Sequence, residues 1–419
     1  MKKLEEYKWI CPDAFVGVNT NVDGTWTPCC AITMNADKNI KSGDTYDDFH
    51  YSTQMKKLRG AFKNQDLNYL KKTCSECIKS EKDNIESLRQ VSFKKYYNEL
   101  KDKKSELENI IETDCKPTFL QSPLLMSLGQ GICNLKCGMC VDYLSSARKQ
   151  ESLQLGEIDK NYPSSKVNHP KKFDEDLDWI LNKCVEFAMP MAEPLLVKKS
   201  FEILDKLDKN KNVLVTTNGT VNVDKLIKYA KDFNYVNIAI SIEGGKDVNS
   251  YIRYPSKWET ILQNFDKLSE YKNFDVSFVS TMNALNIGKF TKMRKDIKDR
   301  TWGKGNMIRG NAPWEVSSIP DDVQEIYLND LYEFGDKSLI KLIEHRVYNK
   351  ENMIKLMKHC KRRDVHRGTY LPDVFPEWEK YYEKAWRLRM DLFWTIYKFI
   401  YSTFWSLCAL LCHRLYRII

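Results

Sequence analysis

From residue 123 onward, short apolar runs alternate with stretches in which apolar residues recur at helical spacing. Strands and helices that alternate in this way build a parallel sheet, because each helix returns the chain to the edge where the next strand begins. Six such units predict an α/β fold with an open or partial (β/α)6 barrel of the TIM type. The predicted strands are Leu124–Leu128, Val185–Ala188, Val213–Thr217, Val236–Ile242, Val276–Thr281 and Asn306–Ile308. The predicted helices between them are Leu195–Leu207, Val223–Phe233, Trp258–Tyr271 and Ile287–Lys298.

The remaining sequence divides into parts that differ in composition and in hydrophobic pattern. Residues 1–116 are rich in lysine, with strand signals only at Ala14–Val18 and Thr25–Thr27 and a solvated helical pattern over 85–112, so they predict a small cysteine-rich α+β domain with a connecting helix. The predicted barrel occupies 117–320, with a polar loop at 153–173. A helical extension of the core is predicted over 321–378. A hydrophobic tail over 379–419 is predicted to form a C-terminal helix.

Composition excludes several classes of protein. With 419 residues, 42% hydrophobic, the chain is long and apolar enough to bury real cores, which excludes a disordered or collagen-like protein. Lys and Arg number 66 against 57 Asp and Glu, a mildly basic balance that permits nucleic acid as a partner without implying it. The basic residues are not interleaved with aromatics on one face, which argues against dedicated nucleic-acid binding. The chain opens with the charged segment MKKLEEYKWI, so a cytoplasmic protein is expected.

Thirteen cysteines is an odd number in a chain too long to need disulfides, which predicts reduced thiols. Several of them form tight groups, and closely spaced thiols on one loop favour a metal. Cys184, Cys360, Cys408 and Cys412 lie in apolar or helical contexts and are interpreted as small buried hydrophobes. Cys115 is given no role.

Cys133, Cys137 and Cys140 follow the first predicted strand directly. A metal held there would lie at the carboxyl end of that strand, where parallel barrels place their active sites. Three thiolates on a four-iron cube leave one iron without a protein ligand, and an open position distinguishes a catalytic centre from a structural one. The spacing therefore predicts a substrate or cofactor bound to the metal.

The segment CNLKCGMC resembles the C-x3-C-x2-C signature of the radical S-adenosylmethionine (SAM) superfamily. The resemblance implies that Cys133, Cys137 and Cys140 hold a [4Fe-4S] cluster whose open iron binds SAM. One electron, from a donor such as flavodoxin or ferredoxin, would then cleave SAM to a 5′-deoxyadenosyl radical that abstracts hydrogen from a substrate. A fortuitous cluster or a zinc site is the alternative.

Further strand ends resemble SAM-binding segments of that superfamily. Met191-Ala192-Glu193-Pro194 is similar to its Gly-Gly-Glu-Pro segment, although both glycines are replaced, and the alternative is that Glu193 merely caps the next helix. Asn218, Ser241 and Glu243 stand at the ends of the third and fourth predicted strands, which resemble the T-N-G and S-[LI]-D-G strand ends of the superfamily. Arg253 is a candidate partner for the SAM carboxylate. Asn283, after the fifth strand, is a further candidate for the ribose or the substrate.

The N-terminal cysteines suggest a second metal site. Asp23-Gly24 lies between short β-like segments as in a hairpin turn, which would bring Cys11 near Cys29. The pattern resembles the twitch domain, a shortened relative of the SPASM domain, and implies an auxiliary [4Fe-4S] cluster on Cys11, Cys29, Cys74 and Cys77. Cys30 is the alternative to Cys29, and zinc is the rival metal. Glu81, Ser87 and Arg89 match the E…S-x-R stretch of such domains, and Asp364-x2-Arg367-Gly368-Thr369 and Phe375-Pro376-Glu377 match the ending of such proteins.

The tail contains a 21-residue segment, Leu392–Cys412, whose only charge is Lys398. Such a length can cross a bilayer, and both flanks are basic. A membrane anchor, a helix packed on protein and a disordered extension all remain open.

The sequence thus predicts a metal-binding radical SAM enzyme, an oxidoreductase in the broad sense. Relatives with twitch or SPASM domains often act in peptide modification, so a peptide or protein side chain is the expected substrate, with small carbohydrates and nucleosides still open. The competing class is a non-enzymatic iron–sulfur or zinc scaffold with a degenerate SAM site, for which Met191 and Ala192 are the main argument.

Overall fold

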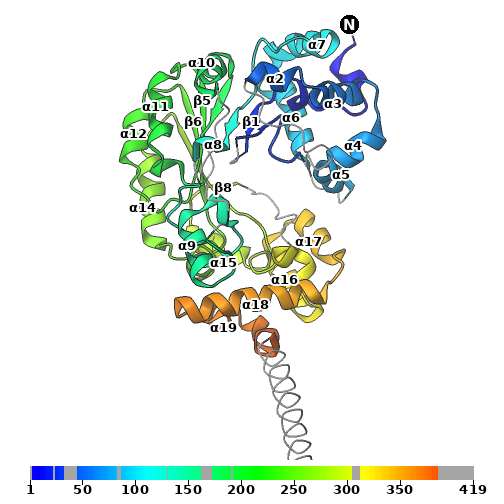
Figure 1. The fold of residues 1–419 in the computed structure, drawn as a ribbon. Coiled ribbons are helices and arrows are strands. Elements are labelled where there is room, and N and C mark those ends of the chain that lie inside the picture. Colours follow the sequence, from blue (N-terminus) through cyan, green and yellow to red (C-terminus); the bar gives the residue numbers. More distant parts are fainter. Residues whose placement is uncertain are drawn as a thin grey trace, which may run out of the picture.

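The computed structural model shows an α/β protein built on one eight-stranded sheet (Figure 1). It describes residues 2–21, 24–32, 45–82, 86–129, 131–160, 162, 172–189, 192–303 and 312–385. The strand order is β2-β1-β3-β4-β5-β6-β7-β8, and all neighbouring strands are parallel except the antiparallel pair β1 and β2. The strands are β1 Asn19–Thr20, β2 Trp26–Thr27, β3 Leu124–Leu125, β4 Glu186–Ala188, β5 Asn212–Thr217, β6 Tyr235–Ser241, β7 Phe274–Val279 and β8 Trp302–Gly303.

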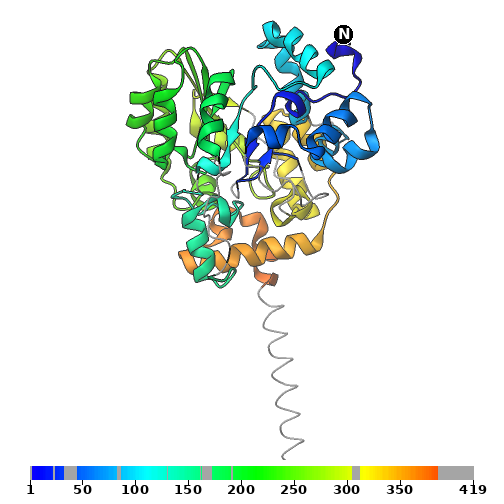
Figure 2. The same ribbon diagram turned by 45° about the horizontal axis from the view of Figure 1, so that its top comes forward.

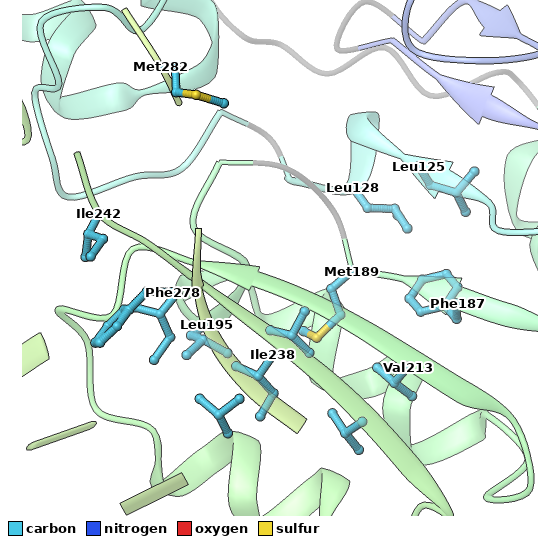
Figure 3. Close-up of a cluster of buried hydrophobic side chains, with 14 of the residues drawn as sticks. Leu125, Leu128, Phe187, Met189, Leu195, Val213, Ile238, Ile242, Phe278 and Met282 are labelled. Atoms are coloured by element: carbon cyan, nitrogen blue, oxygen red, sulfur yellow. The ribbon is translucent and has the colours of Figure 1, made fainter. Parts of the chain in front are cut away.

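Strands β3 to β8 form a parallel run of six, the number expected for an open barrel, although β8 precedes the predicted sixth strand Asn306–Ile308. Burial alternates along β5, β6 and β7, as period-2 side chains require when one face of a sheet is covered. Phe187, Val213, Ile238 and Phe278 belong to the buried hydrophobic cluster (Figure 3). The intervening positions of the opposite face, such as Thr216 and Ala239, are exposed or half-buried. The inner face of the curved sheet is therefore the less covered one.

Helices α10 Phe173–Lys183, α11 Lys198–Lys206, α12 Asp224–Ala230 and α14 Trp258–Ser269 lie along one side of the sheet (Figure 1). Helix α13, Lys246–Ile252, comes between β6 and α14 in the chain, and α15, Phe290–Ile297, follows β7. Helix α13 was not predicted. The first predicted strand is shorter than expected, because the run 124–128 turns after Leu125 into α8, Met126–Gly129. The predicted strand Asn306–Ile308 lies outside the described residues, as do residues 161 and 163–171 of the predicted loop 153–173.

The N-terminal region joins the same sheet instead of standing apart. Strand β1 pairs with β3 through Asn19 and Leu124, and the hydroxyls of Thr20 and Ser127 lie 2.8 Å apart. The hairpin predicted around Gly24 is confirmed as β1–β2, with Gly24 in the left-handed region at φ 83°. The predicted strand Ala14–Val18 is wrong, because Asp13–Val16 forms helix α1 with Pro12 at its N-cap. A short apolar run of this length does not distinguish a buried strand from a buried helical turn.

Further helices cover this N-terminal hairpin: α2 Tyr46–His50, α3 Thr53–Lys63, α4 Leu67–Thr73, α5 Ser75–Lys82, α6 Leu88–Asn98 and α7 Lys104–Thr113. The single solvated helix predicted over 85–112 is instead two helices, which meet at a 3-10 turn, Lys101–Lys103. The second is not merely solvated, since Leu107, Ile110 and Ile111 are buried. The break in the helix lets this apolar face reach the core.

The described C-terminal part is helical, with α16 Asp321–Phe334, α17 Lys337–Glu344, α18 Lys350–Arg367 and α19 Leu371–Val374. Helix α18 lies across the bottom of the molecule in both views (Figures 1 and 2). None of the helices in the described ranges has the length and apolarity needed to cross a membrane. The predicted tail helix Leu392–Cys412 lies outside these ranges.

Candidate functional site

The three-cysteine segment 133–140 follows β3 and α8, at the carboxyl edge of the sheet. Its backbone is held on one side by the chain that follows β6: the amide of Lys136 donates to the carbonyl of Tyr254 (2.7 Å), and that of Gly138 donates to the carbonyl of Ile252 (2.8 Å). We call residues 133–140 the cysteine loop. These two hydrogen bonds attach the cysteine loop to the segment that follows β6.

Three consecutive carbonyls of the cysteine loop accept hydrogen bonds from side chains on the other side. Arg367 donates to Lys136 O (2.6 Å), Arg148 donates to Cys137 O (3.0 Å) and His359 Nε2 lies 3.1 Å from Gly138 O. Arg148 belongs to α9, Ser146–Gln154, and the other two belong to α18. These roles were not predicted; the one sequence signal for them was the position of Arg367 in the D-x2-R-G-T ending.

Burial and the neighbouring Arg363 hold the pKa of His359 well below its ordinary value, so the imidazole is neutral. Its Nδ1 then accepts from Arg363 (3.1 Å), which leaves Nε2–H to donate to Gly138. Glu151, fully buried, accepts two bonds from Arg367 at 2.8 and 2.6 Å. A connected polar network of side chains from α9 and α18 thus holds the backbone carbonyls of the cysteine loop in place.

Gly138 is also fixed by packing. A Cβ atom at this position would lie 2.6 Å from ring atoms of Trp314, which is buried and packs edge-on against His359. Contacts this short do not occur with real side chains, so even alanine must displace the loop or the indole. The glycine between Cys137 and Cys140 is therefore required by a tertiary contact.

We expect Gly138→Ala to lower the iron retained after anaerobic reconstitution several-fold, because the loop would be displaced from Trp314. Gly60→Ala is the matched control, since its added Cβ meets no atom within 4 Å and it lies inside helix α3. The control should keep its iron and gain about 0.5–1 kcal/mol in unfolding free energy. Equal iron in the wild type and Gly138→Ala would contradict the packing argument.

The three thiols of the loop lie close enough to influence one another. Burial raises the pKa of Cys137 to about 12, and it also raises the pKa of Cys133 and Cys140. The positive charge of Arg253 opposes these shifts at all three sulfurs. Asn218 Nδ2 lies 3.8 Å from Cys133 Sγ and donates to Asn134 Oδ1 (2.8 Å). The predicted residues Asn218, at a strand end, and Arg253, after the next strand, are therefore brought to the cysteines.

Glu193 is fully buried between the cysteine loop and β5. Its amide donates to Ile132 O (2.9 Å), and its carboxylate accepts from Thr217 Oγ1 (2.8 Å) and Asn218 N (2.7 Å). Burial raises the pKa of this carboxyl to about 7. It also accepts from Leu195 N (3.2 Å) at the start of the 3-10 turn Pro194–Leu196. Glu193 thus caps this turn, and its carboxylate also joins the turn to the end of β5.

Ala192 stands where a glycine was expected from the resemblance, and its φ is 79°. This left-handed conformation costs a residue with a Cβ about 1 kcal/mol, and glycine adopts it freely. The backbone geometry that glycine would supply is therefore kept at this position. Met191 lies outside the described residues.

The second strand-end carboxylate, Glu243, is also fully buried. It accepts from Arg253 Nε (3.0 Å) and Nη2 (2.8 Å) on one oxygen, and from Thr281 N (3.1 Å) and Asn286 Nδ2 (2.9 Å) on the other. Burial raises the pKa of Glu243 to about 7, although the positive charge of Arg253 lowers it. Ser241 ends β6 and is half-buried. Glu243 therefore holds the Arg253 guanidinium in place while its charge acts on the cysteines.

Asn283 was predicted to face the ribose or the substrate, but its side chain is used in the turn after β7. It donates to Thr281 O (3.0 Å) and accepts from Leu285 N (3.0 Å), and it is fully buried. This geometry gives Asn283 a local structural role.

The N-terminal cysteines form a second group. The pKa of Cys11 is raised by burial first, and then by the charges of Asp13, Cys29, Cys74 and Cys77. Cys29 is half-buried, whereas Cys30 is exposed.

The predicted E…S-x-R residues frame this group. Arg89 donates to both oxygens of Glu81 at 2.9 Å and to the carbonyl of Ile10 (3.1 Å), and Ser87 donates to Glu81 (2.5 Å). The hydroxyl of Tyr96 is buried and has no hydrogen-bond partner among the described residues, and Asp13 and Cys11 both raise its pKa after burial does. An orphaned hydroxyl beside Cys11 fits a group that accepts a hydrogen bond there.

In the described ranges, no set of three or more His, Cys, Asp or Glu side chains is arranged closely enough to hold a metal ion. Both ligand sets, Cys133/Cys137/Cys140 and Cys11/Cys29/Cys74/Cys77, therefore stay predictions.

Comparisons with known proteins bear on the barrel. Residues 128–296 match the family model described as the radical SAM superfamily. No curated protein matches the chain. Among solved structures, the chain is similar to Streptococcus suis SuiB, in a crystal structure described as bound to S-adenosylmethionine, with a TM-score of 0.38 and 12% identity. The similarity covers 69% of this chain and 60% of SuiB, so the chain spans less than two thirds of that protein.

Proposed function

Residues 128–296 form a radical SAM domain, and on that premise we propose that this chain is an enzyme that cleaves SAM reductively at a [4Fe-4S] cluster held by Cys133, Cys137 and Cys140. When bound, the cluster and SAM supply a 5′-deoxyadenosyl radical that abstracts hydrogen from a substrate. The observation that carries the proposal is the cysteine loop itself. It lies at the carboxyl edge of a parallel sheet, inside the matched region.

The residues around the loop fit such a cluster chemically. Thiolate is the ligand that iron–sulfur clusters require, and metal binding must displace the thiol protons that burial retains. Arg253 and the Asn218 amide supply positive charge and an N–H group at these sulfurs, and both stabilise thiolates. The network of Arg148, His359 and Arg367 keeps the loop backbone in place.

We propose that SAM is bound along the strand ends. Ala192, Glu193 and Pro194 would contact its methionyl amino group, Arg253 would face its carboxylate, and Asn218, Ser241 and Glu243 would line the remaining edge. The left-handed Ala192 and the buried position of Glu193 support this arrangement. Asn283 is left out, because its polar atoms are used in the turn.

We further propose that Cys11, Cys29, Cys74 and Cys77 hold an auxiliary [4Fe-4S] cluster. The charges of Cys29, Cys74 and Cys77 that act on Cys11, the Arg89–Glu81 frame and the orphaned Tyr96 hydroxyl support it. Cys29 is favoured over Cys30 because Cys30 is exposed. Four thiolates complete a coordination shell, so this cluster would be structural or would relay electrons.

The substrate that we propose is a peptide or a protein side chain, on the resemblance of the N-terminal motifs to the twitch domain. Incubation of the reduced enzyme and SAM with candidate peptides, followed by mass spectrometry, tests this part separately. Failure of every peptide, together with reaction of a carbohydrate or nucleoside, would replace it.

The proposal is tested by anaerobic reconstitution of the full chain with iron and sulfide. We expect about eight irons per chain, from two four-iron clusters, and 5′-deoxyadenosine after reduction with dithionite and addition of SAM. Zinc in place of iron, or full clusters that leave SAM intact, would favour the alternative of a non-enzymatic scaffold. The glycine-like backbone of Ala192 argues against that alternative.

A further inference from the structure

Helix α18 concentrates positive charge. Of its 18 residues, seven are Lys or Arg and two are Asp or Glu, a net charge of +5 in a chain whose total is +9. The side of α18 that faces the protein and the side that faces solvent differ in how this charge is neutralised.

The inner side of α18 is neutralised against the protein. Arg363 is buried and pairs with Glu157 (2.6 Å), and Arg367 pairs with the buried Glu151 (2.6 Å). These arginines belong to the network that holds the cysteine loop, so their charge is not available to a partner.

The outer side keeps its charge exposed to solvent. The side chains of Lys355 and Arg362 are 56% and 46% exposed, and Lys358 and His366 are exposed as well. Arg362 also lies 3.2 Å from Glu157, which it shares with Arg363, so its charge is partly neutralised. These residues recur at three- and four-residue spacing, which places them on one face of the helix. Lys355 pairs with Glu351 at 2.7 Å, but an exposed pair of this kind is weak and opens readily to another carboxylate. Val365, 76% exposed, adds an apolar contact point beside them.

This outer face is one helix away from the cysteine loop. His359, next to Lys358 in sequence, makes the contact with Gly138 O, between Cys137 and Cys140. An α-helix with its side chains is about 10–12 Å across. A redox centre docked on the outer face would therefore be separated from the loop by roughly that thickness, and short separations favour electron transfer.

We propose that the outer face of α18, defined by Lys355, Lys358, Arg362 and His366, docks an acidic one-electron carrier protein. The inference rests on the proposed function, because reductive SAM cleavage consumes one electron per turnover. The carrier is oxidised by one electron and the iron–sulfur site is reduced by one. Complementary charge would speed the encounter and make it sensitive to salt.

The test compares two reductants on the full, reconstituted chain. Reduced flavodoxin serves as the acidic protein carrier, and dithionite serves as a small reductant that needs no docking face. In Lys355→Glu/Lys358→Glu, we expect the flavodoxin-driven rate of 5′-deoxyadenosine formation to fall at least about tenfold at low salt. The dithionite-driven rate should stay within about twofold of the wild type.

The matched control is Lys198→Glu/Lys206→Glu on α11, which makes the same change in net charge at exposed positions away from α18 (Figure 1). Its flavodoxin-driven rate should stay within about twofold of the wild type. An equal loss in both double variants, or a loss in neither, would overturn the proposal.

A binding titration with oxidised flavodoxin separates this inference from the proposed function, because it requires no SAM cleavage. We expect wild-type affinity to fall with rising salt and the α18 double variant to bind at least about tenfold more weakly than the α11 control. If dithionite also fails to yield 5′-deoxyadenosine, the proposed function falls, and the titration still decides the docking face. Equal affinity of the two double variants would overturn docking on α18.

Discussion

Cys137→Ala is expected to abolish 5′-deoxyadenosine formation and to remove the iron of one cluster. Cys137 is the most buried of the three loop cysteines, and the loop around it is held at the carbonyls of residues 136, 137 and 138. The loop backbone is therefore held in place and cannot shift to compensate for the lost thiolate. Iron content, the electron paramagnetic resonance signal of the reduced protein and product formation measure the effect.

Cys184→Ala is the matched control. Cys184 is equally buried, and its thiol donates only to the carbonyl of Leu181 (3.3 Å). The control should retain its iron and its activity, with a loss of stability of at most a few kcal/mol from the truncated side chain. Full activity in Cys137→Ala would show that the cluster is held elsewhere. Loss in both variants would indicate a general folding defect.

Arg253→Met is expected to lower the free energy of unfolding by about 3–5 kcal/mol, because it leaves a fully buried carboxylate without its cation. Glu243 would keep only its bonds from Thr281 and Asn286. Denaturant unfolding of the cluster-free protein measures the change. The double variant Arg253→Met/Glu243→Gln should recover much of the loss, since it removes the uncompensated charge.

The loss should also depend on pH. Burial already raises the pKa of Glu243 to about 7 beside Arg253, and removal of that cation raises it further. Because the folded pKa lies above the unfolded value of about 4.3, folding takes up a proton and stability falls as pH rises through the folded pKa. Arg253→Met should therefore lose more stability relative to the wild type at pH 9 than at pH 6. A loss that is equal at both values would mean that Glu243 does not carry the effect.

Local patterns account for the parts of the fold that were predicted correctly. The period-2 runs of β5, β6 and β7 and the amphipathic helices between them follow from side-chain spacing along one segment, and the open parallel sheet follows from their order. Local ambiguity explains the failures. The run at Ala14–Val18 was too short to separate strand from helix, and the pairing of β1 with β3 joins segments about a hundred residues apart.

The sequence by itself determined the candidate ligands, since the spacing of Cys133, Cys137 and Cys140 requires only a loop after a strand. It also placed Glu193, Asn218 and Glu243 at strand ends that meet on one edge. Only the tertiary structure decided how the cysteine loop is held. The contacts of His359 and Arg367 with the loop cross more than two hundred residues, and the need for glycine at 138 comes from Trp314. Spacing encodes which side chains one segment presents together, whereas contacts between distant segments depend on how the whole chain packs.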